Sequence, residues 1–196
     1  LQFMNTLLLF NQTNFSTSIW WKLKNNISGY KNETGSQLVT EIARNRCFRI
    51  AESDLKRKNP QYKSRYFVQL REDGYLCWIN INGLDIEKCP NHFQKRLIYD
   101  EEFIQKKIPF ILDWIDLQSK KLNNYKWGGT LGPDFDCSGL IQAAFMRQEI
   151  YIPRDSYQIM NFCRHLFYFP GKINQLKIGD LLFFGEDNEC NHVAIY

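Results

Sequence analysis

The chain has 196 residues, of which 44% are hydrophobic and 15% aromatic, so it can bury a core and is not a disordered chain. The net charge is only +4 and the basic residues are scattered, so there is no reason to expect nucleic-acid binding. The sequence contains no run of about 18 apolar residues, so no membrane span is predicted. Six cysteines without a CxxC pair predict neither a zinc site nor a disulfide scaffold; they favour buried thiols in a reduced, cytosolic chain.

Residues 26–90 are expected to form a small all-β domain. Gln37–Ala43 and Cys47–Ser53 are candidate strands. The run "RYFVQL-REDG-YLCWINI" has two β-rich halves on either side of Asp73-Gly74, which is typical of a hairpin. Several short strands so close together predict a small barrel, and the polar stretch 56–64 is expected to be an exposed loop.

Residues 91–122 are expected to form a helical linker. Pro90 marks its boundary, and Asp100 is a candidate N-cap before two glutamates. Pro109 is expected to kink or divide this helix. Four isoleucines recur at helical spacing and predict a buried face: Ile104, Ile108, Ile111 and Ile115.

Residues 123–196 have a different pattern of predicted elements. A glycine-rich loop leads into a predicted helix that begins at Cys137. Another helix begins within "IPRDSYQIM", and "IGDLLFFGEDNECNHVAIY" is typical of a hairpin whose second strand contains His192. A helix N-terminus favours a thiolate, so Cys137 is a candidate nucleophile with His192 as its general base. Taken by themselves, one cysteine and one histidine are also compatible with purely structural roles.

Five sequence blocks in order resemble the NlpC family of bacterial cell-wall cysteine peptidases: "YKWGG", "DCSG", "PRDSYQ", "GDLLFF" and "HVAIY". The third block departs from the family pattern, since Gln158 falls one position early. The stretch "FVQLREDGYLCWI" resembles the SH3-like domain that precedes the catalytic domain in one branch of this family. The resemblance implies an α+β chain: a small all-β SH3-like barrel, then a papain-like NlpC-type domain with Cys137 as nucleophile and His192 as base.

That branch cleaves the D-γ-glutamyl–diamino acid bond of murein stem peptides that carry a free N-terminal L-alanine. The resemblance assigns the pocket for the free amine to Tyr75, Asp155 and Ser156, the stabilisation of the oxyanion to Tyr125, and part of the pocket wall to Trp127. Judged from the residues alone, Tyr75 also fits a cross-strand hairpin role and Asp155 a simple helix cap. The resemblance implies a murein peptide as partner. We also expect a monomer without cofactor or metal and with no nucleic-acid or membrane partner. The weak secretory signal favours a cytoplasmic location, with a periplasmic or cell-wall location as the alternative.

The two ends of the sequence are unusual. The chain begins at Leu1 with a poor secretory signal, and the role of residues 1–25 stays open. It stops within "NHVAIY", a pattern typical of the middle of a buried strand, so we expect a fragment that is incomplete at its C-terminus. The third catalytic residue of the family is then expected beyond Tyr196. Two alternatives remain: a non-catalytic cell-wall peptide-binding module or inactive fragment, and a papain-like transferase or amidase.

Overall fold

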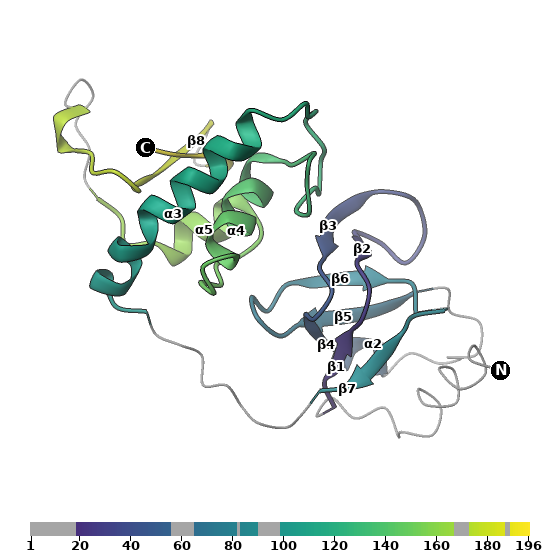
Figure 1. Ribbon diagram of the computed structural model, residues 1–196. Helices are drawn as coiled ribbons and strands as arrows, with labels where there is room; N and C mark the ends of the chain where they lie inside the picture. Colours follow the sequence, from purple (N-terminus) through teal and green to yellow (C-terminus); the bar gives the residue numbers. More distant parts are fainter. Residues whose placement is uncertain (1–18, 56–64, 82, 90–98, 167–172, 187–188) are drawn as a thin grey trace. The chain divides into compact units, whose positions relative to one another are not determined.

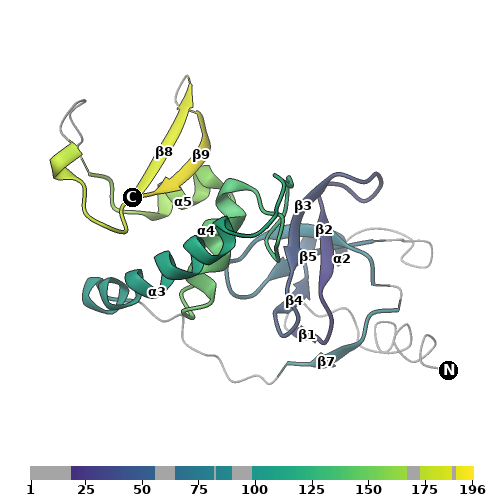
Figure 2. The same cartoon turned by 45° about the horizontal axis from the view of Figure 1, so that its top comes forward.

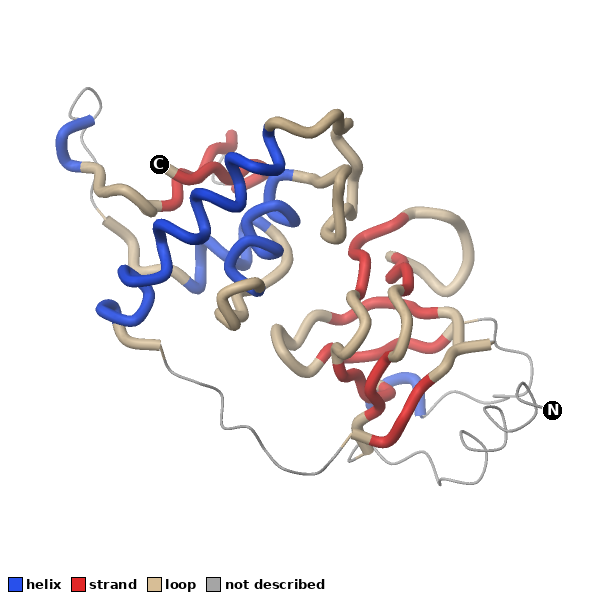
Figure 3. Tube along the Cα trace, in the orientation of Figure 1, coloured by secondary structure: helices blue, strands red, loops and turns tan. Residues whose placement is uncertain are grey.

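The computed structural model describes residues 19–55, 65–81, 83–89, 99–166, 173–186 and 189–196. The chain separates into two compact units, Leu1–Phe93 and Gln94–Tyr196, and each is considered by itself. Strands dominate the first unit, whereas the second contains the longer helices (Figures 1 and 3). The expected loop at 56–64 and the boundary at Pro90 lie outside the described residues.

The described part of the first unit forms an antiparallel sheet of seven strands in the order β3-β2-β6-β5-β4-β1-β7. Buried side chains from both halves of this order pack into one cluster, among them Trp21, Ile42, Phe48, Val68 and Ile79. Strands so far apart in the order can share a core only if the sheet curls on itself. The elements are β1 (Trp21–Leu23), β2 (Ile27–Tyr30), β3 (Leu38–Ile42), β4 (Cys47–Ile50), α2 (Glu52–Leu55), β5 (Tyr66–Leu70), β6 (Leu76–Ile79) and β7 (Ile86–Lys88).

The hairpin predicted around Asp73-Gly74 is confirmed, because β5 and β6 pair antiparallel. Gly74 has a positive φ of 75°, which a glycine adopts without strain. The turn is closed by Leu70, whose N–H donates to the carbonyl of Tyr75 at 2.8 Å. The strand predicted over Gln37–Ala43 is confirmed as β3. The strand predicted over Cys47–Ser53 is too long, since the chain turns into the short helix α2 directly after β4.

The described part of the second unit combines three α-helices with a two-stranded antiparallel sheet. Helix α3 packs against α4, and both α4 and α5 pack against β9. Figure 2 shows β8 and β9 as adjacent strands that pair along their length. The chain is therefore an α+β protein. The elements are α3 (Glu101–Ser119), α4 (Cys137–Met146), α5 (Ser156–Phe162), the 3-10 turn η2 (Ile173–Gln175), β8 (Leu181–Glu186) and β9 (Glu189–Ile195).

Helix α3 begins where the sequence predicts. The Asp100 carboxylate accepts the backbone N–H of Phe103 at 2.7 Å and caps the helix. Ile108 and Ile111 are buried in the core that α3 shares with α4, so the helix expected within the linker 91–122 is packed into the second unit. Pro109 does not divide the helix, which continues from Glu101 to Ser119; the proline lies on the exposed face.

Candidate active site

Cys137 is the first residue of α4, which confirms the helix predicted to begin there. Asp136 caps this helix: its Oδ1 accepts the backbone N–H of Gly139 at 2.6 Å. The cap satisfies one of the N–H groups that the first turn of any helix leaves without a partner. The Cys137 side chain is partly exposed, whereas most of the helix behind it is buried. A reactive thiol can therefore reach solvent from a rigid support.

The loop of residues 124–136 packs tightly against the start of α4. Asp136 connects the two, because its Oδ2 accepts the N–H of Gly128 at 2.8 Å. A Cβ atom on Gly139 would lie 2.0 Å from the carbonyl oxygen of Gly129, and one on Gly129 would lie 2.5 Å from the carbonyl oxygen of Asp134. Gly129 and Gly139 are thus required for the close approach of the loop to the helix.

Tyr125 hydrogen-bonds to the candidate nucleophile. Its hydroxyl bonds to the thiol of Cys137 and also accepts the backbone N–H of Cys137. Burial raises the pKa of Tyr125, the neighbouring Cys137 thiol and Asp136 carboxylate raise it further, and the bond from the Cys137 N–H opposes this rise. The hydroxyl therefore retains its proton, as an oxyanion donor must. Trp127, two residues along the same loop, is exposed at 65%.

A buried ion pair lies directly beneath this site. The guanidinium of Arg154 donates to the two carboxylate oxygens of Asp136 at 3.1 and 2.6 Å and to the hydroxyl of Ser138 at 2.9 Å. Arg154 is only 2% exposed. The sequence alone did not predict that these two charged residues bind each other. The available signal was that each charge stands beside a predicted helix start, in "DCSG" and "PRDS".

Asp155 and Ser156, predicted to bind the substrate amine, stand at the start of α5. Asp155 is the N-cap residue, and its backbone N–H donates to Oε1 of Gln158 at 3.3 Å. Ser156 is buried, and its hydroxyl donates to the carbonyl of Cys190 in β9 at 3.2 Å. Ser156 thus joins α5 to the strand that carries His192. Their roles in amine binding stay predictions.

His192 is the fourth residue of β9, and its side chain is exposed. It lies opposite Phe184 in the hairpin, with the two ring centroids 5.8 Å apart. Because β9 packs against α4, the structure brings together the elements that carry His192 and Cys137. Within the described ranges, no hydrogen bond joins the imidazole to the Cys137 thiol. The catalytic pairing of these residues stays a prediction.

Tyr75 lies in the first unit, whereas the other predicted site residues lie in the second. Its backbone N–H donates to the Asp73 carboxylate at 3.0 Å, and its ring packs on the first unit's core. The turn between β5 and β6 and the packing of the ring on this core thus account for its position. Its role toward a substrate stays a prediction.

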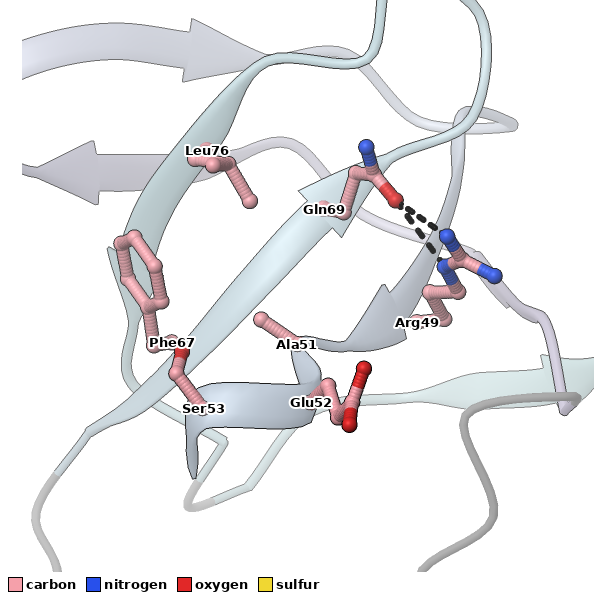
Figure 4. Close-up of a pocket in the computed structure, with 7 residues that line it drawn as sticks. All are labelled: Arg49, Ala51, Glu52, Ser53, Phe67, Gln69 and Leu76. Atoms are coloured by element: carbon pink, nitrogen blue, oxygen red, sulfur yellow. Dashed lines mark hydrogen bonds between the residues drawn. The ribbon is translucent and has the colours of Figure 1, made fainter. Parts of the chain in front are cut away.

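The first unit also has a surface pocket of about 340 Å³ (Figure 4). Phe67 and Leu76 form an apolar side of it, and Arg49 and Gln69 a polar one. The guanidinium of Arg49 donates twice to Oε1 of Gln69, at 3.0 and 2.6 Å, and lies over the ring of Trp20. The Arg49 guanidinium thus already has Gln69 and Trp20 as partners. The lining of the pocket includes none of the predicted site residues.

The described residues contain no group of three or more His, Cys, Asp and Glu side chains arranged to hold a metal ion. Among the same residues, no helix combines the length and the apolar character needed to cross a membrane.

Sequence models of two known families match parts of the chain. The NlpC/P60 family matches residues 122–196, and the bacterial dipeptidyl-peptidase Sh3 domain matches residues 30–84. The chain therefore carries an NlpC/P60 domain preceded by a bacterial SH3 domain, which confirms the resemblance seen in the five sequence blocks and in the hairpin.

Named relatives share the NlpC/P60 part. The chain is 35% identical over 72 residues to a protein of Mycobacterium tuberculosis named probable endopeptidase, covering 37% of this chain and 17% of the relative. It is 35% identical over 77 residues to the bifunctional muramidase/DL-endopeptidase CwlT of Bacillus subtilis, covering 37% and 22%. The probable endopeptidase p60 of Listeria monocytogenes is 35% identical over 72 residues, covering 37% and 14%. The chain thus spans less than a quarter of these relatives.

Solved structures give a weaker likeness. NlpC2 from Trichomonas vaginalis aligns with 91% of this chain and 59% of its own, at 18% identity and a TM-score of 0.36. An NlpC/P60 family protein from Bacillus cereus aligns with 93% of this chain and 53% of its own, at 20% identity and a TM-score of 0.38.

Proposed function

We propose that this protein is a cysteine endopeptidase of cell-wall peptides, with Cys137 as its nucleophile. One observation carries the proposal: Cys137 stands at the capped start of a buried helix, with the Tyr125 hydroxyl bonded to its thiol and its N–H. The relatives named endopeptidase and DL-endopeptidase support the same class of reaction. The finer proposal is hydrolysis of the D-γ-glutamyl–diamino acid bond of murein peptides.

The proposed chemistry begins with attack of the Cys137 thiolate on the amide carbonyl. The carbonyl oxygen becomes an oxyanion, which needs hydrogen-bond donors aimed at it. In the free protein the Cys137 N–H donates to the Tyr125 oxygen. The oxyanion replaces that oxygen as acceptor, and the Tyr125 O–H then donates to the same oxyanion. Two donors that already touch each other would thus converge on one atom.

His192 completes the cycle in this proposal. It takes the thiol proton from Cys137 and passes it to the leaving amine of the diamino acid, so that a thioester remains on the cysteine. A water molecule, deprotonated by His192, then hydrolyses the thioester and restores the thiol. Approach of the imidazole to the thiol is required during the reaction, and such bonds are often long in an enzyme without substrate.

Hydrolysis of L-Ala-γ-D-Glu-diaminopimelate tests the proposal. The parent protein and Cys137→Ala are incubated with this tripeptide, and release of diaminopimelate is followed by chromatography, with and without a metal chelator. We expect release by the parent in both conditions and none by Cys137→Ala. Cys163→Ala, which changes another partly buried thiol of the second unit, is the matched control and should stay active. Binding of the tripeptide by the parent without release would instead indicate a binding module.

The free N-terminal amine is the proposed determinant of substrate choice. The Asp155 carboxylate would pair with that ammonium, and removing one partner of such a buried charge pair costs about 2–5 kcal/mol. We therefore expect the parent to reject the N-acetylated tripeptide and Asp155→Asn to lose affinity for the free one. Asp113→Asn, an exposed change on α3, is the control. Equal cleavage of both tripeptides by the parent would contradict this pocket and favour action on intact cell wall.

A further inference from the structure

We propose that residues 152–156 hold the reacting groups of the second unit in place, with Arg154 as the main positioning residue. The inference rests on the proposed function, because it concerns the alignment of Cys137, Tyr125 and His192. Arg154 is buried, so it does not touch the substrate; it acts through Asp136.

Asp136 connects Arg154 to the helix turn that carries the proposed nucleophile. Its two carboxylate oxygens accept the N–H groups of Gly128 and Gly139 and both terminal nitrogens of Arg154. Gly128 belongs to the loop that carries Tyr125, and Gly139 to the first turn of α4. One carboxylate therefore fixes the oxyanion donor and the nucleophile relative to each other, and the guanidinium fixes the carboxylate.

The same short segment also holds the neighbouring elements. The carbonyl of Ile152 accepts Nε2 of Gln142, within α4, at 3.1 Å. The hydroxyl of Ser156 donates to the carbonyl of Cys190, two residues before His192. Residues 152–156 thus bond to the helix of the proposed nucleophile at one end and to the strand of the proposed base at the other. Asp155, the proposed amine ligand, lies between these anchors.

The geometry requires an arginine in particular. Its two terminal nitrogens reach three oxygens, which a lysine ammonium cannot do in the same planar arrangement. In the described part of the chain, the Arg154 Nε is buried without a hydrogen-bond partner, a cost that a lysine would not carry. The two terminal nitrogens of the guanidinium are therefore what this site requires of residue 154.

Two substitutions test the proposal: Arg154→Lys keeps the charge without the fork, and Arg154→Gln removes both. The readouts are kcat and KM for the tripeptide, and the rate at which iodoacetamide modifies Cys137, followed by peptide mass spectrometry. All are measured below each variant's own melting transition. Misplacement of reacting groups by about 1 Å lowers the reaction rate by about 100-fold. We therefore expect kcat to fall by about that factor in Arg154→Gln and by less in Arg154→Lys. KM should stay nearly unchanged, and modification of Cys137 should slow in both variants.

Arg46 provides a matched control in the first unit. It is 6% exposed, donates a hydrogen bond to Glu72 at 3.1 Å and forms an ion pair with Asp73 at 2.8 Å. Arg46→Lys and Arg46→Gln therefore also break a buried arginine–carboxylate pair. They should lower the melting temperature and leave the rate of Cys137 modification unchanged.

A folded Arg154→Gln protein with parental kcat and a parental rate of Cys137 modification would overturn the proposal. If Arg154→Gln does not fold, Arg154→Lys decides by the same two rates. Modification by iodoacetamide needs no peptide substrate. A parent protein that cleaves nothing would therefore refute the proposed function, while the effect of Arg154 on Cys137 could still be measured.

Discussion

Tyr125 and Cys137 show how two residues twelve positions apart come to share one hydrogen-bonded site. The tyrosine is placed by its loop and the cysteine by its helix, and the hydroxyl meets both the thiol and the backbone N–H. A phenol hydroxyl in this position donates only while it is protonated. The raised pKa of Tyr125 keeps it protonated at neutral and mildly alkaline pH.

Tyr125→Phe removes this hydroxyl and keeps the ring. Loss of one oxyanion donor typically lowers kcat by about 100- to 1,000-fold, and we expect a fall of that order with KM little changed. Steady-state kinetics on the tripeptide provides the measurement. Tyr151→Phe, a change at another exposed tyrosine of the same unit, should behave as the parent. A Tyr125→Phe protein with parental kcat would remove the tyrosine from the proposed oxyanion site.

Cys77 gives the first unit a pH-dependent stability. Burial raises its pKa from the ordinary 9.0 to about 12. The unfolded chain loses this proton first, so the free energy of unfolding should fall as the pH rises from about 9 to about 12, and this contribution is fully present below pH 9. Urea unfolding under reducing conditions, followed by tryptophan fluorescence, measures the effect.

The matched comparison for this prediction is Cys77→Ala. It should be less stable than the parent at neutral pH, because a buried side chain is shortened, yet its stability should decline less between pH 9 and 11. Cys190→Ala, in the second unit, should keep the parental slope. Parallel pH profiles for the parent and Cys77→Ala would show that the buried thiol is not responsible.

At the scale of elements, the contact between the glycine-rich loop and α4 determines how Tyr125 and Cys137 are placed in the candidate site. Gly139→Ala would place a methyl group 2.0 Å from the backbone oxygen of Gly129, and neither backbone can yield easily. Overpacking of this kind costs about 1–3 kcal/mol or more, so we expect a lower melting temperature and a large loss of kcat. Gly35→Ala is the comparison, since its site has open space but a positive φ of 91°. It should lower stability mildly and leave kcat unchanged.

Elements with a local cause could be predicted from the sequence. The Asp100 cap, the hairpin at Asp73-Gly74 and the helix that begins at Cys137 each depend on residues within a few positions of one another. Turn geometry and helix capping act over that range. The structure therefore reproduces them at the expected residues.

The remaining features depend on partners far away in the sequence. Pro109 does not divide α3, because the helix is held on both sides of the proline by burial of Ile108 and Ile111 against α4. The bond between Arg154 and Asp136 joins residues 18 positions apart. A sequence pattern shows that both charges stand at helix starts, but it does not show which buried partner each one finds.

At the scale of the whole chain, the predicted site residues fall in both units, each of which has its own core. Tyr75 is the predicted contribution of the first unit. Tyr75→Phe removes only its hydroxyl, and loss of a hydrogen bond to a charged group costs about 1.5–3 kcal/mol, so KM for the free-amine tripeptide should rise by about tenfold or more. Tyr30→Phe, in β2 of the same sheet, is the control. An unchanged KM would return Tyr75 to a purely structural role.

The central claim is that Cys137 carries the acyl group during peptide hydrolysis. The direct measurement is to mix the protein with L-Ala-γ-D-Glu-diaminopimelate, quench in acid during turnover, and locate the acyl group by peptide mass spectrometry. We predict an L-Ala-D-Glu thioester on the peptide that contains Cys137, and a more persistent ester at the same position in Cys137→Ser. Turnover of the tripeptide with no adduct at position 137, or with the acyl group on another residue, would contradict the account.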